Sequence, residues 1–598
     1  MATKTSSNRA GRLRYVILGG GIAGCTAAEE LLAMLPPDCA EVTMVTATPI
    51  VKQVGKVVQV TRNLEEMKII ERDADAFGQD HANLRVVQAR VTGLDVSKHT
   101  VECEGGICLP FDRCLICTGA VPKVHATHEH VVGIRDTESV QDLARRLETA
   151  RRVLVLGNGG IALELVHEVT GCELVWAVKD PYVGNTFFDH TASGFVLPEL
   201  EKRRPIRIID NEYTKGGTDG KNDPKKQQQQ QQLQLPLLLQ QQSAHVKEPP
   251  AVESIQASPT GGALGPDWTV GLSTGTGTPA ACNPEANIKP PQAPSGKLLT
   301  ILFRAEIEDL YESPPAPSST GNQDEDWVLW VHLTNGQVWG CDFVVSATGV
   351  MPSVSFLGPE FERGDDGGVL VNENMQTTAS KDVYAAGDCC SMTWPESEVW
   401  FQMRLWTQAR AMARYAARCM AGLVDELGSG FAFELFAHMT RFFGFKVALL
   451  GCFNAQLLKD EEQRRLVQEI QVMPSLTMGG REERVKEDGG DRRGEDESMM
   501  GVLAPSMERG RKGGKEEGDA IAKETMSKDK VEILTRLTPG VEYIKVLLVG
   551  GRVKGAMLVG ESTELAETFE NLILNELDVS AFGVGLLDPD VDIDDYFD

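Results

Sequence analysis

Three glycines near the start of the chain have the spacing of a loop that can hold a pyrophosphate. The sequence YVILGGGIAGCTAAEEL places Gly19, Gly21 and Gly24 between an apolar run and a helix-forming run. In such a strand–turn–helix unit, the first glycine permits the turn, the second lets the backbone approach a pyrophosphate, and the third allows close packing. The helix N-terminus also offers free N–H groups and a positive dipole to phosphates. The pattern therefore predicts a dinucleotide site.

One expected feature of that site is missing. The second strand of such a unit usually ends in an acidic residue that binds the ribose. Here Val45 is followed by Thr46 and Ala47. The ribose contact is then expected from a hydroxyl group, from the backbone or from another part of the chain.

A second loop of the same kind occurs further along the chain. The sequence VLVLGNGGIALELVHEV contains Gly157, Gly159 and Ala162, and the G-x-G-x-x-A variant also belongs to this fold. After the next apolar run come Lys179 and Asp180. An acidic residue there favours NADH and an arginine cluster favours NADPH. One lysine beside one aspartate leaves the choice of nicotinamide cofactor open.

Three later motifs complete the set. LICTGA at 115–120 is an apolar strand that ends in small residues, VVSATG at 344–349 repeats it, and VYAAGD at 383–388 follows. In this order, over residues 14–421 without the first insertion described below, the motifs resemble the pyridine nucleotide-disulphide oxidoreductase superfamily. The resemblance implies FAD in the first site, NADH or NADPH in the second, and hydride transfer between them.

The same resemblance implies roles for particular residues. Asp388 would bind the ribityl chain of FAD, while Thr118 and Gly119 would line the FAD pocket. Lys52 would lie near the flavin, and Glu164 would face the nicotinamide. The helix that contains Trp406 would point its N-terminus at the flavin, where its dipole would stabilise an anionic reduced ring.

Further segments resemble one subgroup of the superfamily. They are NTFFD at 185–189, ALGPDW at 263–268, MRLWTQAR at 403–410, FELFAH at 433–438 and the C-terminal tail 587–598. This closer resemblance implies an enzyme of the cytoplasm and nucleus. It also implies a partner, the tRNA ligase complex, which the protein would guard against oxidation.

The cysteines do not match those of disulphide reductases. One branch of the superfamily carries C-x-x-x-x-C after the second strand, but Thr46–Leu64 contains no cysteine. Another branch carries C-x-x-C in the nicotinamide domain, but between Lys123 and Val344 the cysteines are far apart. Cys114 and Cys117 do form C-x-x-C, on a predicted strand. There they would point to opposite faces, with Cα atoms about 10 Å apart, against the roughly 7 Å limit for a disulphide. We predict that they are core thiols.

Several other side chains could take part in catalysis, but their sequence context does not require it. Cys389 and Cys390 follow Asp388 directly, and a helix N-terminus there would lower a thiol pKa; we favour packing beside the flavin. His438 lacks the His-Pro-Thr-x-x-Glu context of the reductases, so no catalytic residue is assigned. Trp400 and Trp406 fit either an aromatic wall or the core. No metal site is expected.

The elements that must position these residues alternate between strand and helix. Strands are predicted at Tyr15–Leu18, Val42–Val45, Val153–Leu156 and Leu174–Val178, with helices at Ala23–Leu35 and Ile161–Val169. This order predicts an α/β fold with two parallel, doubly wound sheets. Tyr543–Val549 and Arg552–Val559 flank Gly550-Gly551 as a hairpin in a smaller α+β domain.

Domain boundaries follow from these elements. We expect an FAD-binding domain at 12–125 and 346–425, an NAD(P)H-binding domain at 126–345, and a C-terminal domain at 430–598. Two segments, about 214–297 and 459–530, are rich in Gln, Pro, Gly and charged residues. They cannot bury enough apolar surface to offset their ordering entropy, so both are predicted to be disordered insertions.

Composition limits the function. The chain has 598 residues, 42% of them hydrophobic, 13 cysteines and a net charge of -27, which argues against direct nucleic-acid binding. No apolar run is long enough for a membrane span, and the scattered cysteines fit a reducing compartment. The leading hypothesis is an enzyme whose acceptor is oxygen, a quinone or another protein. The alternative is a binding protein whose affinity follows its redox state. The oligomeric state stays open.

Overall fold

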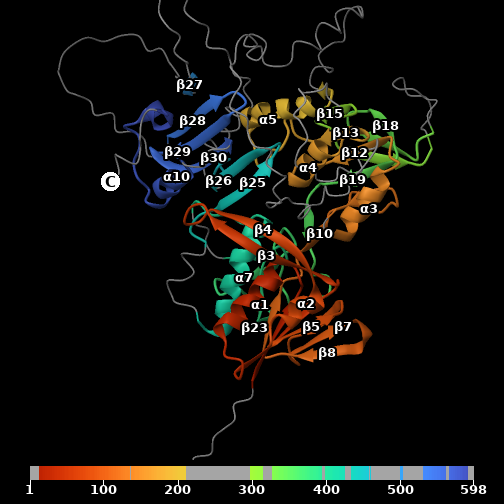
Figure 1. Ribbon diagram of the computed structural model, residues 1–598, viewed down its shortest axis with the longest axis vertical. Helices are drawn as coiled ribbons and strands as arrows, with labels where there is room; N and C mark the ends of the chain where they lie inside the picture. The colour runs from red at the N-terminus through yellow and green to blue at the C-terminus, as the bar shows by residue number, and fades with distance from the viewer. Residues whose placement is uncertain are drawn as a thin grey trace, which may run out of the picture.

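The computed structural model describes most of the chain (Figure 1). The described residues are 12–134, 137–210, 296–313, 326–393, 398–423, 433–456, 458, 499–502, 530–560 and 565–589. The motif at 263–268, nearly all of the first expected insertion and the end of the C-terminal tail lie outside them.

The first unit is built on an eight-stranded sheet with the order β24-β21-β22-β23-β9-β1-β2-β5. Its central strands β23, β9, β1, β2 and β5 run parallel. The strands are β1 (Leu13–Leu18), β2 (Ala40–Thr46), β5 (Leu84–Gln88), β9 (Arg113–Ile116), β21 (Val369–Val371), β22 (Gln376–Thr377), β23 (Ser380–Ala385) and β24 (Cys390–Met392). Helices α1 (Ile22–Met34) and α7 (Trp406–Ala421) pack against each other beside this sheet.

Smaller elements surround the first sheet. Two long strands form an antiparallel hairpin directly after β2. They are β3 (Ile50–Gln59) and β4 (Glu65–Asp73). The remaining elements are α2 (Ala74–Gln79), the three-stranded sheet of β6 (Val91–Asp95), β7 (Thr100–Cys103) and β8 (Ile107–Pro110), and the short 3-10 helix η1 (Glu104–Gly106).

The second unit repeats the parallel design, because buried apolar strands again alternate with helices. Its sheet has the order β11-β19-β12-β13-β15-β14, and all of its strand pairs are parallel. The strands are β11 (Val131–Gly133), β12 (Arg152–Leu156), β13 (Glu173–Val178), β14 (Ile206–Asp210), β15 (Leu299–Phe303) and β19 (Phe343–Ser346). The helices are α3 (Thr137–Leu147), α4 (Gly160–Glu168) and α5 (His190–Arg203).

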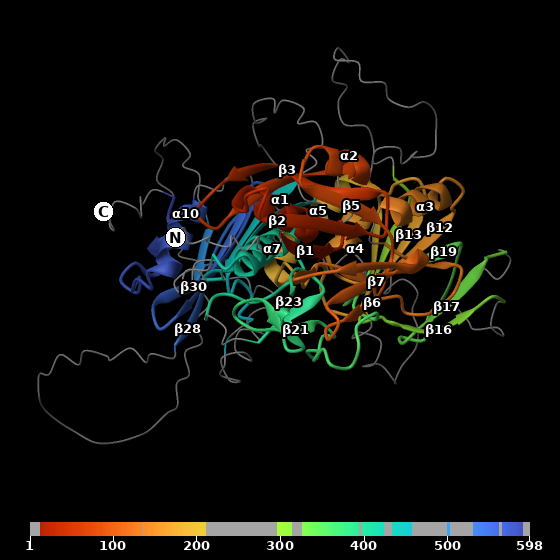
Figure 2. The ribbon, with the colours of Figure 1, turned by 90° about the horizontal axis from the view of Figure 1, so that it is seen from below.

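Two small sheets accompany the second unit. The strands β10 (Ala120–Pro122) and β20 (Val350–Pro352) pair antiparallel where the chain passes between the two units. The strands β16 (Ile307–Tyr311), β17 (Leu329–Leu333) and β18 (Val338–Cys341) form an antiparallel sheet. Figure 2 shows β16 and β17 at the side of the molecule opposite the C-terminal sheet, which is drawn in blue.

The third unit is a six-stranded antiparallel sheet with the order β25-β26-β30-β29-β28-β27. Its elements are β25 (Ala437–Phe442), β26 (Phe445–Gly451), β27 (Met499–Val502), β28 (Val531–Thr538), β29 (Glu542–Val549), β30 (Arg552–Gly560), α10 (Leu565–Leu574) and the 3-10 helix η3 (Gly583–Leu587). The two-residue turn between β29 and β30 has Gly550 at φ 57° and Gly551 at φ 76°. Only glycine adopts such consecutive left-handed angles easily, which confirms the predicted hairpin.

The fold class is therefore the predicted one: two Rossmann-like α/β units and a smaller C-terminal unit. All the predicted strands and helices named above are present, with ends that differ by a residue or two. The structure adds β27, which the sequence did not predict, inside the second expected insertion. Its backbone pairs with β28 from Met499 opposite Leu537 to Val502 opposite Leu534. Within the described residues, no helix is long and apolar enough to cross a membrane.

Candidate dinucleotide sites

The first glycine loop, between β1 and α1, has the geometry of a pyrophosphate cradle. Gly19 has a φ of +123°, and a Cβ there would lie 2.2 Å from the carbonyl oxygen of Cys117. A Cβ on Gly24 would lie 1.8 Å from the carbonyl oxygen of Gly19, so helix and turn touch backbone to backbone. A Cβ on Gly21 would meet nothing within 4 Å. The first and third glycines are thus required by packing, while the second faces open space.

That open space is a cavity of about 310 Å³ in the first unit. Most of the residues predicted for the FAD site line it, namely Gly19, Gly21, Lys52, Thr118, Gly119, Asp388 and Trp406. Gly24 lies beneath the loop and serves helix packing. Because the glycines, a helix N-terminus and a buried carboxylate converge on one cavity, these residues fit a flavin dinucleotide.

The lining also includes residues outside the predicted FAD set. Thr46 and Ala47 line the cavity at the end of β2, where the acidic residue is absent, and Arg90 lines it after β5. The Thr46 hydroxyl donates to the carbonyl of Thr48, 3.1 Å away. Arg90 could have been predicted from the sequence, because it follows a parallel strand and the carboxyl ends of such strands meet at one edge of the sheet.

Lys52 and Asp388 approach the cavity from different elements. The Lys52 Nζ lies 5.6 Å from the centroid of the Trp406 ring and 3.9 Å from Oε1 of Glu71. Asp388 is 6% exposed and follows Gly387, whose φ is +80°. Its backbone carbonyl accepts from Nε of Arg404 at 3.1 Å. The turn before β24 is thereby joined to the segment that begins α7.

The second glycine loop repeats the geometry of the first. Gly157 has a φ of +115°, and a Cβ there would lie 2.2 Å from the carbonyl oxygen of Ala347. A Cβ on Gly159 would meet only the Oγ1 of Thr186, at 3.9 Å. Ala162 is fully buried in α4. Cys117 and Ala347, which directly follow β9 and β19, thus play the same part in the two units, because the backbone carbonyl of each packs against the first glycine of a loop.

Asn158 organises the surroundings of the second loop. Its Nδ2 donates to the Asp180 carboxylate at 2.9 Å, and its Oδ1 accepts from the Gly184 amide at 2.5 Å. The Asp180 side chain is therefore engaged within the protein, while Lys179 is exposed at the end of β13.

A cavity of about 640 Å³ extends from the second loop to the other two units. Glu164 from α4, the segment Asn185–Phe187, Trp406 from α7 and His438 from β25 line it. Trp406 also lines the first cavity, so the two cavities meet at the N-terminus of α7. Gly157, Gly159 and Glu164 of the predicted nicotinamide site are all in the lining, whereas the buried Ala162 packs beneath it.

His438 sits at this junction in an apolar setting. Its Nδ1 lies 3.2 Å from the Thr407 hydroxyl, and its ring lies 6.3 Å from that of Phe187. Burial lowers the pKa of His438 to about 4. The imidazole is therefore neutral at pH 7, where one ring nitrogen donates a hydrogen bond and the other accepts one.

Comparison with known proteins fits this geometry. The family model of pyridine nucleotide-disulphide oxidoreductases matches residues 13–239 and 317–413. The human pyridine nucleotide-disulfide oxidoreductase domain-containing protein 1 is 36% identical over 590 residues, covering 98% of both chains. The chain belongs to the pyridine nucleotide-disulphide oxidoreductase family.

Solved structures show the same fold at low identity. An NAD-dependent persulfide reductase from A. fulgidus has a TM-score of 0.53 and 16% identity, covering 95% of this chain and 78% of that one. A water-forming NADH oxidase from Lactobacillus brevis, bound to NADH, has a TM-score of 0.51 and 13% identity, covering 95% and 91%. Membership of the family makes this chain, in general terms, a flavin oxidoreductase, while the solved structures show its fold.

This member of the family has a hairpin where the disulphide branch carries its cysteine pair. The β3–β4 hairpin follows β2 directly and contains no cysteine. Cys114 lies in β9, and Cys117 follows that strand; both are buried and free. Burial, and then the neighbouring Cys389, raises the pKa of Cys117.

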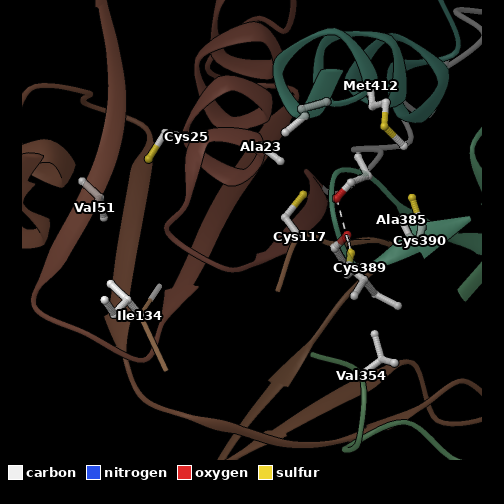
Figure 3. Close-up of a cluster of buried hydrophobic side chains, with 14 of the residues drawn as sticks. Ala23, Cys25, Val51, Cys117, Ile134, Val354, Ala385, Cys389, Cys390 and Met412 are labelled. Carbon is white, nitrogen blue, oxygen red and sulfur yellow. Dashed lines mark hydrogen bonds between the residues drawn. The ribbon is translucent and has the colours of Figure 1, made fainter. Parts of the chain in front are cut away.

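Cys389 does not lie at a helix N-terminus, the setting that would make its thiol reactive. Residues 387–389 form a turn that leads into strand β24 at Cys390, because the sheet continues there and pairs Cys390 with Val369. The Cys389 thiol donates to the carbonyls of Ile116 and Ala386 at 3.2 and 3.3 Å. Figure 3 shows Cys117, Cys389 and Cys390 within one buried cluster. They pack as core side chains.

The tryptophans separate into two kinds. Trp406 is a cavity wall, as described above. Trp400 is 5% exposed and packs edge-on against Phe433, with ring centroids 5.2 Å apart. Trp400 thus belongs to the core. Among the described residues, no group of three or more His, Cys, Asp or Glu side chains is arranged to hold a metal ion.

Proposed function

We propose that this protein is an FAD-dependent NAD(P)H oxidoreductase that works without an active-site dithiol. The observation that carries the proposal is that two cavities, each lined by a glycine loop at the start of a helix, share Trp406 as a lining residue. Bound FAD would accept a hydride from bound NADH or NADPH and pass the electrons to a second acceptor. The protein's contribution is to hold the two groups in register and to keep water out.

The residues divide this work between the two units. Gly21 and the N-terminus of α1 would hold the FAD pyrophosphate, and Asp388 the ribityl hydroxyls. Lys52 and the N-terminus of α7 would face the ring, where positive potential favours an electron-rich flavin. Gly159 and the N-terminus of α4 would hold the nicotinamide dinucleotide, with Glu164 toward its reactive end.

The absence of a dithiol limits how electrons can leave the flavin. A hairpin occupies the place of the C-x-x-x-x-C segment, and the buried thiols near the flavin lie in the core. Electrons therefore leave the flavin directly, to a small molecule such as oxygen or a quinone, or to a protein. We do not assign a residue that acts as nucleophile or base.

The resemblance of several segments to one subgroup supports a second proposal. In it, the protein acts in the cytoplasm and nucleus as a slow-turnover guard of the tRNA ligase complex, whose affinity for that client follows the flavin's redox state. Both proposals require the same two sites, so they differ only in turnover and in the acceptor.

One experiment tests what the two proposals share, which is bound FAD and its reduction by NADH or NADPH. Anaerobic addition of NADH and NADPH in turn, followed by air, should bleach and then restore the flavin absorbance. Rapid repeated cycles with a small acceptor favour the enzyme, and slow reoxidation favours the guard protein. A protein purified without flavin, and not reconstituted by FAD, would contradict both.

A further inference from the structure

A fully buried ion pair connects the second unit to the C-terminal unit. The Nζ of Lys545 lies 2.8 Å from Oδ2 of Asp189, and their side chains are 2% and 4% exposed. The Tyr543 hydroxyl donates to the same carboxylate at 3.1 Å, and Lys545 also donates to Oδ1 of Asn454 at 2.7 Å. Each charge therefore has polar partners inside the protein.

The two partners belong to elements far apart in the sequence. Asp189 is the N-cap of α5, where its Oδ1 accepts from the Ala192 amide at 2.8 Å. Lys545 lies in the middle of β29. Figure 1 shows α5 beside the C-terminal sheet. A buried ion pair is weak evidence for stability, because desolvation offsets its attraction, and its best-attested use is to select one arrangement.

Asp189 also ends the segment that walls the larger cavity. Gly184 at the start of that segment is held by Asn158 of the glycine loop, and Asn185–Phe187 line the cavity. The Phe187 and Phe188 rings both pack against Phe442 of β25, with centroids 4.9 and 5.8 Å away. The cavity wall is thus fixed at one end by the glycine loop and at the other by the C-terminal unit.

The C-terminal unit is fixed just as firmly to the first unit. Glu570 of α10 is 1% exposed and accepts from the backbone and side-chain amides of Asn63, at 2.9 and 3.0 Å, and from the Thr61 hydroxyl. Leu64, fully buried, packs into the core of the C-terminal unit. These residues form the tip of the β3–β4 hairpin, and β3 carries Lys52 at the first cavity.

The two nucleotide units are connected by two chain crossings, whose strand pairing is short. The chain passes between them through β10 and β20, a ribbon of three residue pairs. We propose that the C-terminal unit is a brace that sets the angle between the two nucleotide units, with Asp189 and Lys545 as positioning residues for hydride transfer. This inference rests on the proposed function, since it concerns how the two cavities are held in register.

The expected consequence is kinetic. Transfer between two held groups depends steeply on their distance, and a misplacement of ~1 Å can slow it ~100-fold. Loosening the brace should therefore slow flavin reduction at saturating nucleotide. Nucleotide affinity should change little, because the glycine loop of the second unit is untouched.

The test compares three variants of the FAD-loaded, full-length protein. Lys545→Met should lower the rate constant of flavin reduction at saturating NADH or NADPH by at least ~10-fold, with the nucleotide Kd within about 3-fold of the parent. Asp189→Asn with Lys545→Gln, a neutral hydrogen-bonded pair, should recover most of the rate. Lys202→Met, which removes an exposed pair with Glu199 on the same helix, should have no effect.

A structural measurement accompanies the kinetics. Spin labels at the exposed native Cys39 and at Arg207→Cys, with Cys108→Ser and Cys282→Ser, report the distance between the nucleotide units. The distance distribution should broaden in Lys545→Met and narrow again in the neutral pair. An unchanged distribution and rate in Lys545→Met would overturn the brace. So would a slow neutral pair whose distribution is as narrow as the parent's.

Different results would contradict the proposed function and the brace. If neither nucleotide reduces the parent protein, the proposed function fails, while the spin-label distances still report whether the pair sets the angle. If the parent is reduced normally and Lys545→Met does not fold, the neutral pair alone decides the question, because it leaves no unpaired buried charge.

Discussion

The Nζ of Lys52 lies 5.6 Å from the ring centroid of Trp406, although the two residues come from opposite ends of the first unit. Lys52 enters on the β3 strand of a hairpin that the C-terminal unit holds at its tip. Trp406 begins α7 and lines both cavities. The pair marks the place where the two cavities share a lining residue.

FAD retention should depend on the Asp388 carboxylate. Asp388→Ala removes a buried hydrogen-bonding group from the first cavity, at an expected cost of about 1.5–3 kcal/mol in FAD binding. The ratio of flavin to protein absorbance after gel filtration measures this. Asp382→Ala, which removes a surface pair with Arg113, is the control and should keep its flavin. Equal flavin occupancy in both variants would remove Asp388 from the site.

Valine at Gly159 should abolish nucleotide binding, whereas valine at Gly157 should disturb folding. At Gly159 the new Cβ meets only Thr186 at 3.9 Å, so Gly159→Val should fold, keep its FAD and lose reduction by NADH and NADPH. At Gly157 the Cβ would lie 2.2 Å from the Ala347 carbonyl, so Gly157→Val should lower Tm or prevent folding. Normal reduction of Gly159→Val would show that the second loop does not hold the nucleotide.

Stability should fall in mild acid because of His438. Its pKa drops from the ordinary 6.5 to about 4 on burial. Between these values the unfolded chain binds more protons than the folded one, so stability is fully present above pH 6.5 and declines as the pH falls toward 4. The slope from this group is at most about 1.4 kcal/mol per pH unit. Thermal unfolding from pH 7 to 5 should be less pH-dependent in His438→Gln, and identical slopes would refute the assignment.

Reduction should consume two electrons per FAD. No cysteine pair occupies a family position, and Cys114 and Cys117 flank the end of one strand. Since Cys389 neighbours Cys117, the sharpest variant is Cys117→Ser with Cys389→Ser, beside Cys114→Ser with Cys117→Ser. Anaerobic titration should give the same stoichiometry in the parent and both variants. Uptake of four electrons by the parent would point to a hidden dithiol, and the variant that restores two would identify it.

The two low-complexity segments should differ in their tolerance of deletion. Removing Lys225–Gln242, which lies outside the described residues, should leave flavin content and reduction unchanged. In the second segment, Gly479–Glu497 should be dispensable, whereas Met499–Val502 forms the edge strand β27. Deleting those four residues should lower Tm, since each lost strand hydrogen bond is worth about 1 kcal/mol. An unchanged Tm would mean that β27 adds no stability.

The sequence alone determined the parts of the molecule whose physics is local. The spacing of Gly19, Gly21 and Gly24, and later of Gly157 and Gly159, predicted two strand–turn–helix units, because the first glycine of each turn has a positive φ and leaves no room for a Cβ. Apolar strands that alternate with helices predicted parallel sheets, and Gly550-Gly551 predicted a hairpin. Cysteine spacing predicted that the two usual dithiols are absent.

Tertiary structure decided whatever depends on residues that meet across units. That Trp406 borders both cavities, and that Asp189 pairs with Lys545, follows from the packing of elements hundreds of residues apart, which leaves no local pattern. The turn at Cys389 and the strand at Met499–Val502 were also set by partners, Val369 and β28 respectively. A short segment of weak strand propensity can still join a sheet, because its backbone hydrogen bonds depend little on the identity of its side chains.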